Sequence, residues 1–226
     1  MPKFESNAVV DSFQAFLVEG AKFTAKEEYP IIREDMVPAE PPKKVLPFSK
    51  AITFHGDLSD CVVDFYSPDG SFERVRKNPK RYLGFLHRCQ GIIGPDFSIH
   101  SDMPLIMQKS QMNDNLSLSF YYANNGIPLY PNCRGGSDCL NEEFLEALPR
   151  NSYLALGVHG FVHRKDQKHE WRDWISAVID TLNPKGFIVV GHLPKDVVED
   201  FKDKVEFHIY DAYIETRWKE VKNDVD

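Results

Sequence analysis

Carboxylates and other polar side chains crowd one short stretch of this chain, which reads GIIGPDFSIHSDMP from Gly91 to Pro104. The stretch begins as an apolar run and breaks at Gly94-Pro95. Four polar residues then come within seven positions: Asp96, Ser98, His100 and Asp102. A carboxylate in such a place can act as a general base or bind a divalent cation. The same pattern also fits a capped turn, in which Asp96 closes an Asx-turn and Asp102 caps the following helix.

Polar residues also follow four later runs that are typical of strands. They are, in chain order, Asn132 and Arg134 after IPLYP, His159 after LALGV, His192 after FIVVG, and Tyr210 and Asp211 after FHI. In α/β proteins, ligands bind at the carboxyl ends of the parallel strands. We therefore expect these residues and the stretch after GIIG to line one cleft.

The residue types indicate a role for each position in this cleft. The candidate catalytic residues are Asp96, Asp102, His159 and His192. The candidate substrate-binding residues are Ser98, Asn132, Arg134, Tyr210 and Asp211, with Arg134 as the group for phosphate. A divalent metal is a further hypothesis, because imidazole and carboxylate ligands suit zinc, manganese and iron. Its candidate ligands are Asp96, His159, His192 and Asp211. The alternative for each histidine is a structural group held by hydrogen bonds.

The elements that must position these residues alternate between strand and helix about six times after Ala51. The runs YLALGV and FIVVG are apolar throughout, as in parallel strands that helices cover. AITFH and CVVDFY are also predicted as strands, and residues 103–126 as one long helix. The sequence thus predicts an α/β fold of alternating β-α units with a mostly parallel sheet. Two architectures fit, an open doubly wound sheet and an incomplete or deviant (β/α) barrel.

The N-terminal part differs from the rest of the chain. DSFQAFLVEGAKF predicts a short amphipathic helix, and VPAEPPKKVLP carries four prolines, which favour extended chain. We interpret residues 1–50 as an N-terminal arm with a Pro-rich linker, and residues 51–226 as a single α/β domain. A last helix is predicted at DAYIETRWKEVK.

Charge and apolar content limit the class of protein. The net charge of −7 argues against a surface that coats nucleic acid, which is normally basic. The clearest basic segment is RVRKNPKRY, whose charged residues extend from Arg74 to Arg81. It is either a solvated helix start or a clamp for nucleotide or nucleic-acid phosphates, and in the second case Arg81 joins the substrate-binding residues. The oligomeric state is left open.

The sequence also predicts where the protein works. No run approaches about 18 consecutive apolar residues, so no membrane contact is expected. The N-terminus lacks the basic and apolar regions of a secretory signal, which predicts a cytoplasmic location. The four cysteines, Cys61, Cys89, Cys133 and Cys139, form no CxxC pair, so we expect free thiols.

A longer pattern carries a family resemblance over roughly residues 45–215. The runs PDFS, DMP and a following Gln108, then GIPLYPN, ALGVHG and FIVVGHLP, resemble the domain of unknown function 4417 family. The resemblance implies an intracellular protein of a phage, plasmid or other mobile element of Firmicutes. It also implies that the family shares a motif from Asp96 to Gln108, which would form one wall of the cleft. This adds Gln108 to the candidate binding residues. It brings no mechanism.

Two functions of different class remain. The first is a hydrolase-like enzyme that acts on a nucleotide or nucleic-acid phosphate from the cleft at the strand ends. The second is a non-catalytic module that uses the same cleft to bind a small ligand or a host protein, as a regulator or counter-defence factor. The sequence does not decide between enzyme and binding module.

Overall fold

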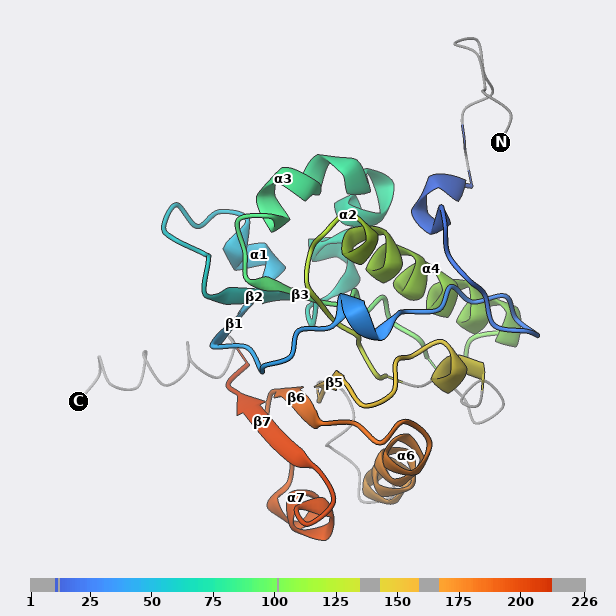
Figure 1. Ribbon diagram of the computed structural model, residues 1–226, viewed down its shortest axis with the longest axis vertical. Coiled ribbons are helices and arrows are strands. Elements are labelled where there is room, and N and C mark those ends of the chain that lie inside the picture. Colours follow the sequence, from blue (N-terminus) through green and yellow to red (C-terminus); the bar gives the residue numbers. More distant parts are fainter. Residues whose placement is uncertain (1–10, 12, 101, 135–142, 159–166, 213–226) are drawn as a thin grey trace.

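Parallel strands form the centre of the molecule (Figure 1). The computed structural model describes residues 11, 13–100, 102–134, 143–158 and 167–212. Within these residues the strands are β1 (Lys44–Pro47), β2 (Cys61–Asp64), β3 (Gly91–Ile93), β4 (Leu129–Tyr130), β5 (Tyr153–Gly157), β6 (Gly186–Val190) and β7 (Glu206–Tyr210). Every ladder between them is parallel, so all strands end at the same edge.

The strands follow one another in chain order. One sheet has the order β1-β2-β3-β4 and the other the order β5-β6-β7. The two are joined just beyond β4, where the Cys133 N–H donates to the Ala155 carbonyl at 2.7 Å and the Ala155 N–H to the Pro131 carbonyl at 2.8 Å. A doubly wound sheet reverses its strand order at a switch point. The described strands show no such reversal, so the barrel is the architecture that this order fits.

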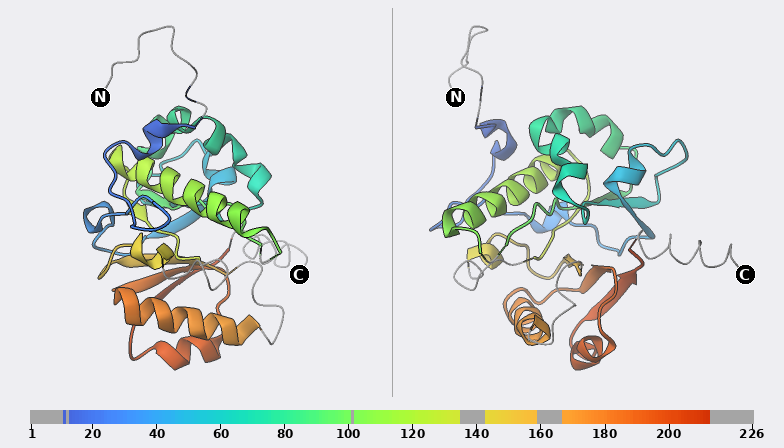
Figure 2. Two further views of the ribbon diagram at one scale, coloured as in Figure 1. Left: turned by 90° about the vertical axis from the view of Figure 1, so that its right-hand side faces the viewer. Right: turned by 180° about the vertical axis from the view of Figure 1, so that it is seen from behind.

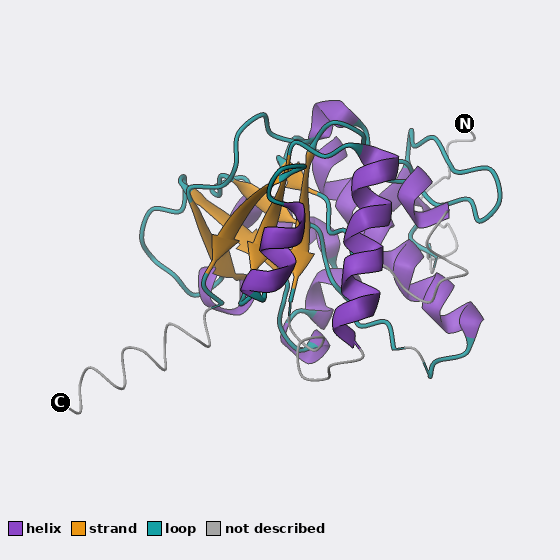
Figure 3. Cartoon of the chain, turned by 90° about the horizontal axis from the view of Figure 1, so that it is seen from below, coloured by secondary structure: helices purple, strands orange, loops and turns teal. Residues whose placement is uncertain are grey.

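Helices pack around this group of strands (Figure 3). The α-helices with described bounds are α1 (Phe48–Ala51), α2 (Glu73–Lys77), α3 (Leu83–Leu86), α4 (Leu105–Asn124), α6 (Gln167–Leu182) and α7 (Lys195–Phe201). Four 3-10 turns have described bounds as well: η1 (Ala15–Val18), η2 (Glu34–Met36), η3 (Asp69–Ser71) and η4 (Pro79–Tyr82). The α/β fold predicted from the sequence is confirmed.

Two separate apolar clusters show how the strands curl. The larger cluster joins the helices to one face of the strands, through residues such as Val63, Ile92 and Phe187. The smaller one lies on the other face and draws on strand and loop residues alone: Val62, Tyr66, Ile93, Tyr130, Tyr153, Ala155, Ile188 and Val190, with Val37, Val45 and Tyr210 packed against them. These side chains alternate with the helix-facing ones and are buried without a covering helix, because they cover one another. The strands therefore curl into an incomplete barrel with this second cluster inside.

The N-terminal arm lies against the barrel and extends it. Residues 44–47, which the sequence assigns to the arm, form β1 and pair with β2. The described strands have no ladder between β7 and β1; a side chain of β7 bridges this seam instead, since the Tyr210 hydroxyl donates to the Pro42 carbonyl at 2.5 Å. From β4, the Tyr130 hydroxyl also holds the arm by donating to the Glu40 carbonyl at 2.7 Å. The division into an arm and one domain stays a prediction.

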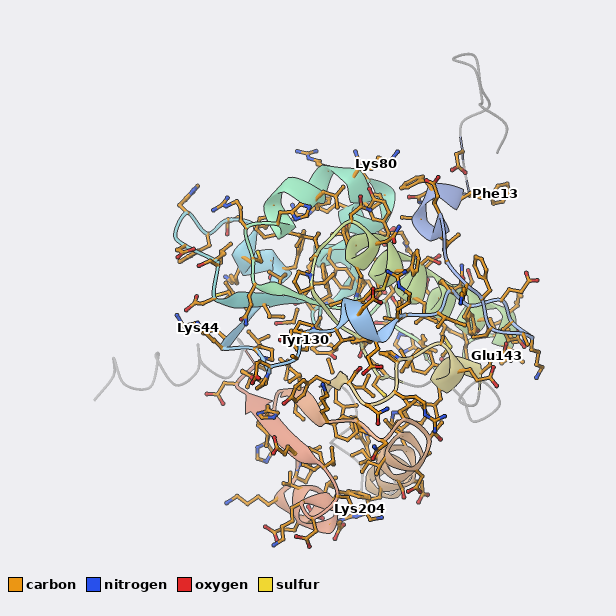
Figure 4. All side chains as sticks on the ribbon, viewed as in Figure 1. Phe13, Lys44, Lys80, Tyr130, Glu143 and Lys204 are labelled. Carbon is orange, nitrogen blue, oxygen red and sulfur yellow. The ribbon has the colours of Figure 1, made fainter. Side chains whose placement is uncertain are left out.

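A second set of bonds fixes the middle of the arm. Glu143 Oε1 accepts the backbone N–H groups of Lys26 and Glu27 at 2.7 and 2.5 Å. Figure 4 shows Glu143 at the right-hand side of the molecule. The Ile32 N–H donates to the Ala147 carbonyl at 2.9 Å. The rear and side views show the arm running along α4 (Figure 2).

Some local predictions are wrong. AITFH is not a strand: α1 ends at Ala51 and a turn follows, in which Phe54 is half exposed. The amphipathic helix predicted near Phe16 is only the 3-10 turn η1. The predicted helix at NPKRYLGFLHRC is split into η4 and α3. Most of the predicted last helix falls on residues 213 onward, which lie outside the described part of the chain.

Gly157→Ala is expected to lower the free energy of unfolding by about 1–3 kcal/mol, the usual cost of overpacking. Gly157 faces the barrel interior, and a Cβ added there would overlap the ring of Tyr66, which is buried. Urea unfolding measures the change. The matched control is Gly84→Ala in α3, where no atom lies within 4 Å of an added Cβ and alanine favours the helix. Equal effects of the two variants would contradict the packing of Tyr66 on Gly157.

Candidate functional site

A chain of hydrogen bonds joins the carboxyl ends of β2, β3 and β4. Arg134 Nη1 lies 2.7 Å from Asp96 Oδ2, and Asn132 Nδ2 donates to Asp96 Oδ1 at 2.8 Å. The Tyr66 hydroxyl donates to Asn132 Oδ1 at 3.0 Å. Asp96 is only 6% exposed, and the side chain of Arg134 is 19% exposed. The structure thus brings these four residues, the strand-end network, together around a nearly buried ion pair.

The loop after β3 is built to present Asp96. Gly94 lets the start of this loop pass close to α4, because a Cβ there would lie 2.6 Å from Ser119 Oγ and would displace that hydroxyl. The side chain of Asn115, also on α4, accepts the Phe97 N–H at 2.8 Å and donates to the Phe97 carbonyl at 3.1 Å. Both backbone groups of Phe97 are therefore fixed to the long helix, which holds the neighbouring Asp96 at the strand end.

The residue between Asn132 and Arg134 is fixed from the other side. The Trp174 indole N–H of α6 donates to the Cys133 carbonyl at 2.9 Å. The Cys133 thiol is fully buried, and burial raises its pKa. Cys133, Cys61 and Cys89 are free thiols, while Cys139 lies outside the described residues. Cys133 is therefore a structural residue between two polar neighbours.

Asp64 is a second buried carboxyl at this end of the barrel, and the sequence analysis missed it. It is the last residue of β2, 3% exposed, and two positions after Val62, so its side chain points into the barrel. Asp64 Oδ1 accepts the Tyr66 N–H at 2.9 Å. Burial raises the pKa of Asp64 to about 7, against a smaller lowering by this hydrogen bond. A carboxyl with such a pKa exchanges its proton near neutral pH.

Tyr66 links the two carboxyls. Burial raises the pKa of its phenol well above the usual value, and the negative charges of Asp96 and Asp64 raise it further, against the opposing charge of Arg134. The hydroxyl therefore stays protonated and lies within electrostatic reach of all three. The signal for Asp64 and Tyr66 was the single charge in CVVDFY, a run otherwise typical of a buried strand.

A small cavity lies beside the strand-end network, between the end of β4 and α4. Asn132 and Arg134 line it from the barrel side, and Asn115 and Ser119 from the helix. Its volume of about 10 Å³ holds roughly one water molecule.

The other residues of the opening stretch have structural contacts. Ser98 donates its N–H and its hydroxyl to the Asp69 carboxylate, at 3.2 and 2.9 Å. Gln108 is buried and donates to the Met103 carbonyl at 2.9 Å. Asp102 is exposed, and α4 begins after Pro104 without a side-chain cap, so the capping alternative for Asp102 is wrong.

The remaining predicted residues that the structure describes are exposed or make other contacts. His192 and Asp211 follow β6 and β7 and are exposed. Tyr210 is held by the Pro42 carbonyl. His159 lies outside the described residues. In the part of the chain that the structure describes, no three His, Cys, Asp or Glu side chains come together to hold a metal, so Asp96, His192 and Asp211 form no such group.

Internal contacts take up much of the basic segment. Arg76 pairs with Glu73 at 2.8 Å and with Asp114 at 3.1 Å, and lies over the Phe97 ring. Lys80 Nζ lies 4.2 Å from the centre of the Phe16 ring, near the top of the molecule in Figure 4. Arg81 is exposed. The segment therefore offers fewer charges to a ligand than its sequence indicates.

Comparison with known proteins identifies the family. The chain matches the model of the domain of unknown function DUF4417 over residues 23–223, and it belongs to this family. It is similar to the Gene 1 protein of Mycobacterium phage L5, 24% identical over 163 residues, which are 72% of this chain and 70% of the relative. It is also similar to the Gene 1 protein of Mycobacterium phage D29, 22% identical over 166 residues, 74% of this chain and 60% of the relative. No solved structure matches.

These matches confirm the resemblance and the relation to phage proteins. They name no reaction, ligand or partner. Among the described residues, no helix is long and apolar enough to cross a membrane.

Proposed function

We propose that the chain is a hydrolase-like enzyme that binds a nucleotide or nucleic-acid phosphate at the strand-end network. The observation that carries this proposal is the ion pair of Asp96 and Arg134 at the carboxyl ends of parallel strands, where barrels of this kind hold their ligands. Arg134 is the phosphate-binding group, because a guanidinium has five N–H donors in a fixed plane.

In this proposal Asp96 orients Arg134 instead of acting as the general base. Asp96 Oδ1 accepts from Asn132 and Oδ2 accepts from Arg134, so each oxygen already has a partner within the network. A guanidinium that a buried carboxylate fixes needs little further ordering when an anion binds. His159, His192 and Asp102 stay candidates for acid–base roles. A divalent metal at the cleft, contact of Arg81 with nucleic acid and a cytoplasmic location are further parts of the proposal.

Phosphate binding tests the proposal. We expect inorganic phosphate and nucleoside monophosphates to bind the purified protein with millimolar or tighter affinity, and Arg134→Lys to weaken binding at least about tenfold, because lysine lacks the planar fork. Isothermal titration calorimetry gives both values. The matched control is Arg88→Lys, at an exposed position after α3. No binding to the wild type, or equal loss in both variants, would contradict a phosphate site at Arg134.

One observation favours the non-catalytic module as a second candidate. The first turn of α4 exposes three apolar side chains in a row: Leu105 44%, Ile106 74% and Met107 51%. Exposed apolar groups of this kind are typical of protein-binding surfaces. If a panel of nucleotides binds at Arg134 but none is converted, even with divalent metal added, the module is the better description.

A further inference from the structure

An exposed phenylalanine lies beside exposed cations where the arm meets α2 and η4. The Phe13 ring is 94% exposed, and Figure 4 shows it at the same upper end of the molecule as Lys80 of η4. Lys77 of α2 and Arg81 of η4 are exposed as well. We call these four residues, Phe13, Lys77, Lys80 and Arg81, the arm–η4 face. The family match starts at residue 23, so it does not include Phe13.

Side-chain contacts hold the start of the arm against the body of the molecule. The Gln14 side chain donates to the Arg76 carbonyl of α2 at 3.2 Å. The Phe16 ring packs edge-on against α4, and Lys80 Nζ lies 4.2 Å from its centre. Phe13 directly precedes Gln14, so these contacts present its exposed ring at a fixed place beside the cations.

The positive charge of this face is concentrated in one stretch of the chain. Residues 74–90 include six Lys and Arg residues and no Asp or Glu, although the chain has a net charge of −7. Two carboxylates neutralise Arg76. No acidic residue among those that the structure describes forms an ion pair with Lys77, Lys80 or Arg81. Asp11 on the arm is exposed and opposes part of this charge. The face is therefore a local site of attraction for anions on an acidic protein.

We propose that the arm–η4 face binds single-stranded nucleic acid. Proteins bind single strands without reading their sequence by placing cations along the phosphates and an aromatic ring on an unpaired base. The bases of a duplex are already stacked on their neighbours, so Phe13 would find no free base there. An acidic peptide would satisfy the cations and leave the ring unused. This inference deepens the part of the proposed function that concerns Arg81, and it does not depend on phosphate binding at Arg134.

Fluorescence anisotropy of a labelled oligothymidylate of about 12 nucleotides measures this binding. Three phosphate contacts predict that log K falls against log salt concentration with a slope of about −2. The double variant Lys80→Gln/Arg81→Gln should bind at least about tenfold more weakly at low salt and reduce the slope to about −0.7. Phe13→Leu should bind about tenfold more weakly with the slope unchanged, because it removes the ring and no charge.

Two variants outside the face are the matched controls, and both should bind as the wild type does. Lys204→Gln removes an exposed cation that also lies over a phenylalanine ring, at the opposite end of the molecule in Figure 4. Phe23→Leu removes another exposed ring of the arm, 46% exposed, which lies at the bridge to Pro30. Circular dichroism confirms that each variant is folded.

The partner is distinguished by further probes. Oligouridylate of the same length is the RNA probe, and binding of either single strand that depends on Phe13 supports the face. A duplex of the same length and polyglutamate should bind more weakly and should not respond to Phe13→Leu. The face is overturned if neither single strand binds, or if Phe13→Leu binds as the wild type does. Polyglutamate binding as tight as that of the oligonucleotide overturns it as well and indicates an acidic protein as the partner.

Phosphate titration separates this inference from the site at Arg134. If phosphate binds and no oligonucleotide does, the arm–η4 face fails and the phosphate site stands. If oligonucleotides bind through Phe13 and phosphate does not bind, the face stands and the phosphate site fails. If Arg134→Lys abolishes oligonucleotide binding and the variants of the face do not change it, the strand is bound at the strand-end network and the face is overturned.

Discussion

Asp64→Asn is expected to stabilise the protein by roughly 2–4 kcal/mol at pH 8 and to change little at pH 4. The folded-state pKa of Asp64 is raised from 3.8 to about 7, because its charged form is buried. The neutral acid therefore contributes stability that is fully present below pH 3.8 and is lost as the pH rises through 7. Asparagine keeps the neutral form at every pH, and its side-chain oxygen can still accept the Tyr66 N–H.

The measurement is the difference in unfolding free energy between variant and wild type from pH 4 to pH 8, by urea denaturation. This difference should grow with pH and level off above 7. Asp203→Asn serves as the control, because Asp203 is exposed in the turn after α7, and its difference curve should be flat. A flat curve for Asp64→Asn would mean that folding does not raise the pKa of Asp64 and would contradict its burial as a neutral acid.

Arg134→Met is expected to cost about 3–5 kcal/mol of stability at pH 7, because it leaves the buried Asp96 carboxylate without its cation. Methionine keeps much of the apolar stem, so the loss reports the charge. The double variant Asp96→Asn/Arg134→Met should recover most of it, since both charges are then gone. A double-mutant cycle from urea unfolding gives the coupling energy.

The control for this pair is an ion-pair network at the surface. Arg172 contacts Asp200 at 2.6 Å and Asp196 at 2.9 Å, with both carboxylates about half exposed. Arg172→Met should cost far less than Arg134→Met, because solvent screens an ion pair at the surface. Equal costs at Arg134 and Arg172, or no coupling between Asp96 and Arg134, would show that the pair near the barrel end is hydrated and not structural.

Continuous apolar runs and one long helical segment of the sequence predicted much of the fold. β5 and β6 are uninterrupted apolar runs, and α4 extends over 20 residues, so both kinds of element stand out in a single sequence. β1 was missed because its KVLP run ends in a proline and comes shortly after two other prolines, Pro41 and Pro42. Prolines so close together favour the interpretation as a linker. The order of the strands, which separates a barrel from a doubly wound sheet, depends on contacts between distant residues that periodicity does not carry.

The site was predictable only where polar residues follow a strand. Asp96, Asn132 and Arg134 were found in this way, and the structure places them in one hydrogen-bonded group. Asp64 is the last residue inside its strand, so a rule that considers only the residues after a strand passed over it. His192 follows a strand and yet is exposed, because the rule gives the edge of the sheet but not the direction of a side chain.

The seam of the barrel has a consequence for how the protein is made. Each strand from β2 to β7 finds its neighbour in chain already synthesised, so the barrel can grow as the chain leaves the ribosome. The contact between Pro42 and Tyr210 joins residues 168 positions apart. At typical elongation rates the arm waits on the order of ten to thirty seconds for its partner on β7. During that interval the interior of the barrel is open on one side, and the nascent chain is at its most vulnerable to proteases and to pairing with other exposed strands.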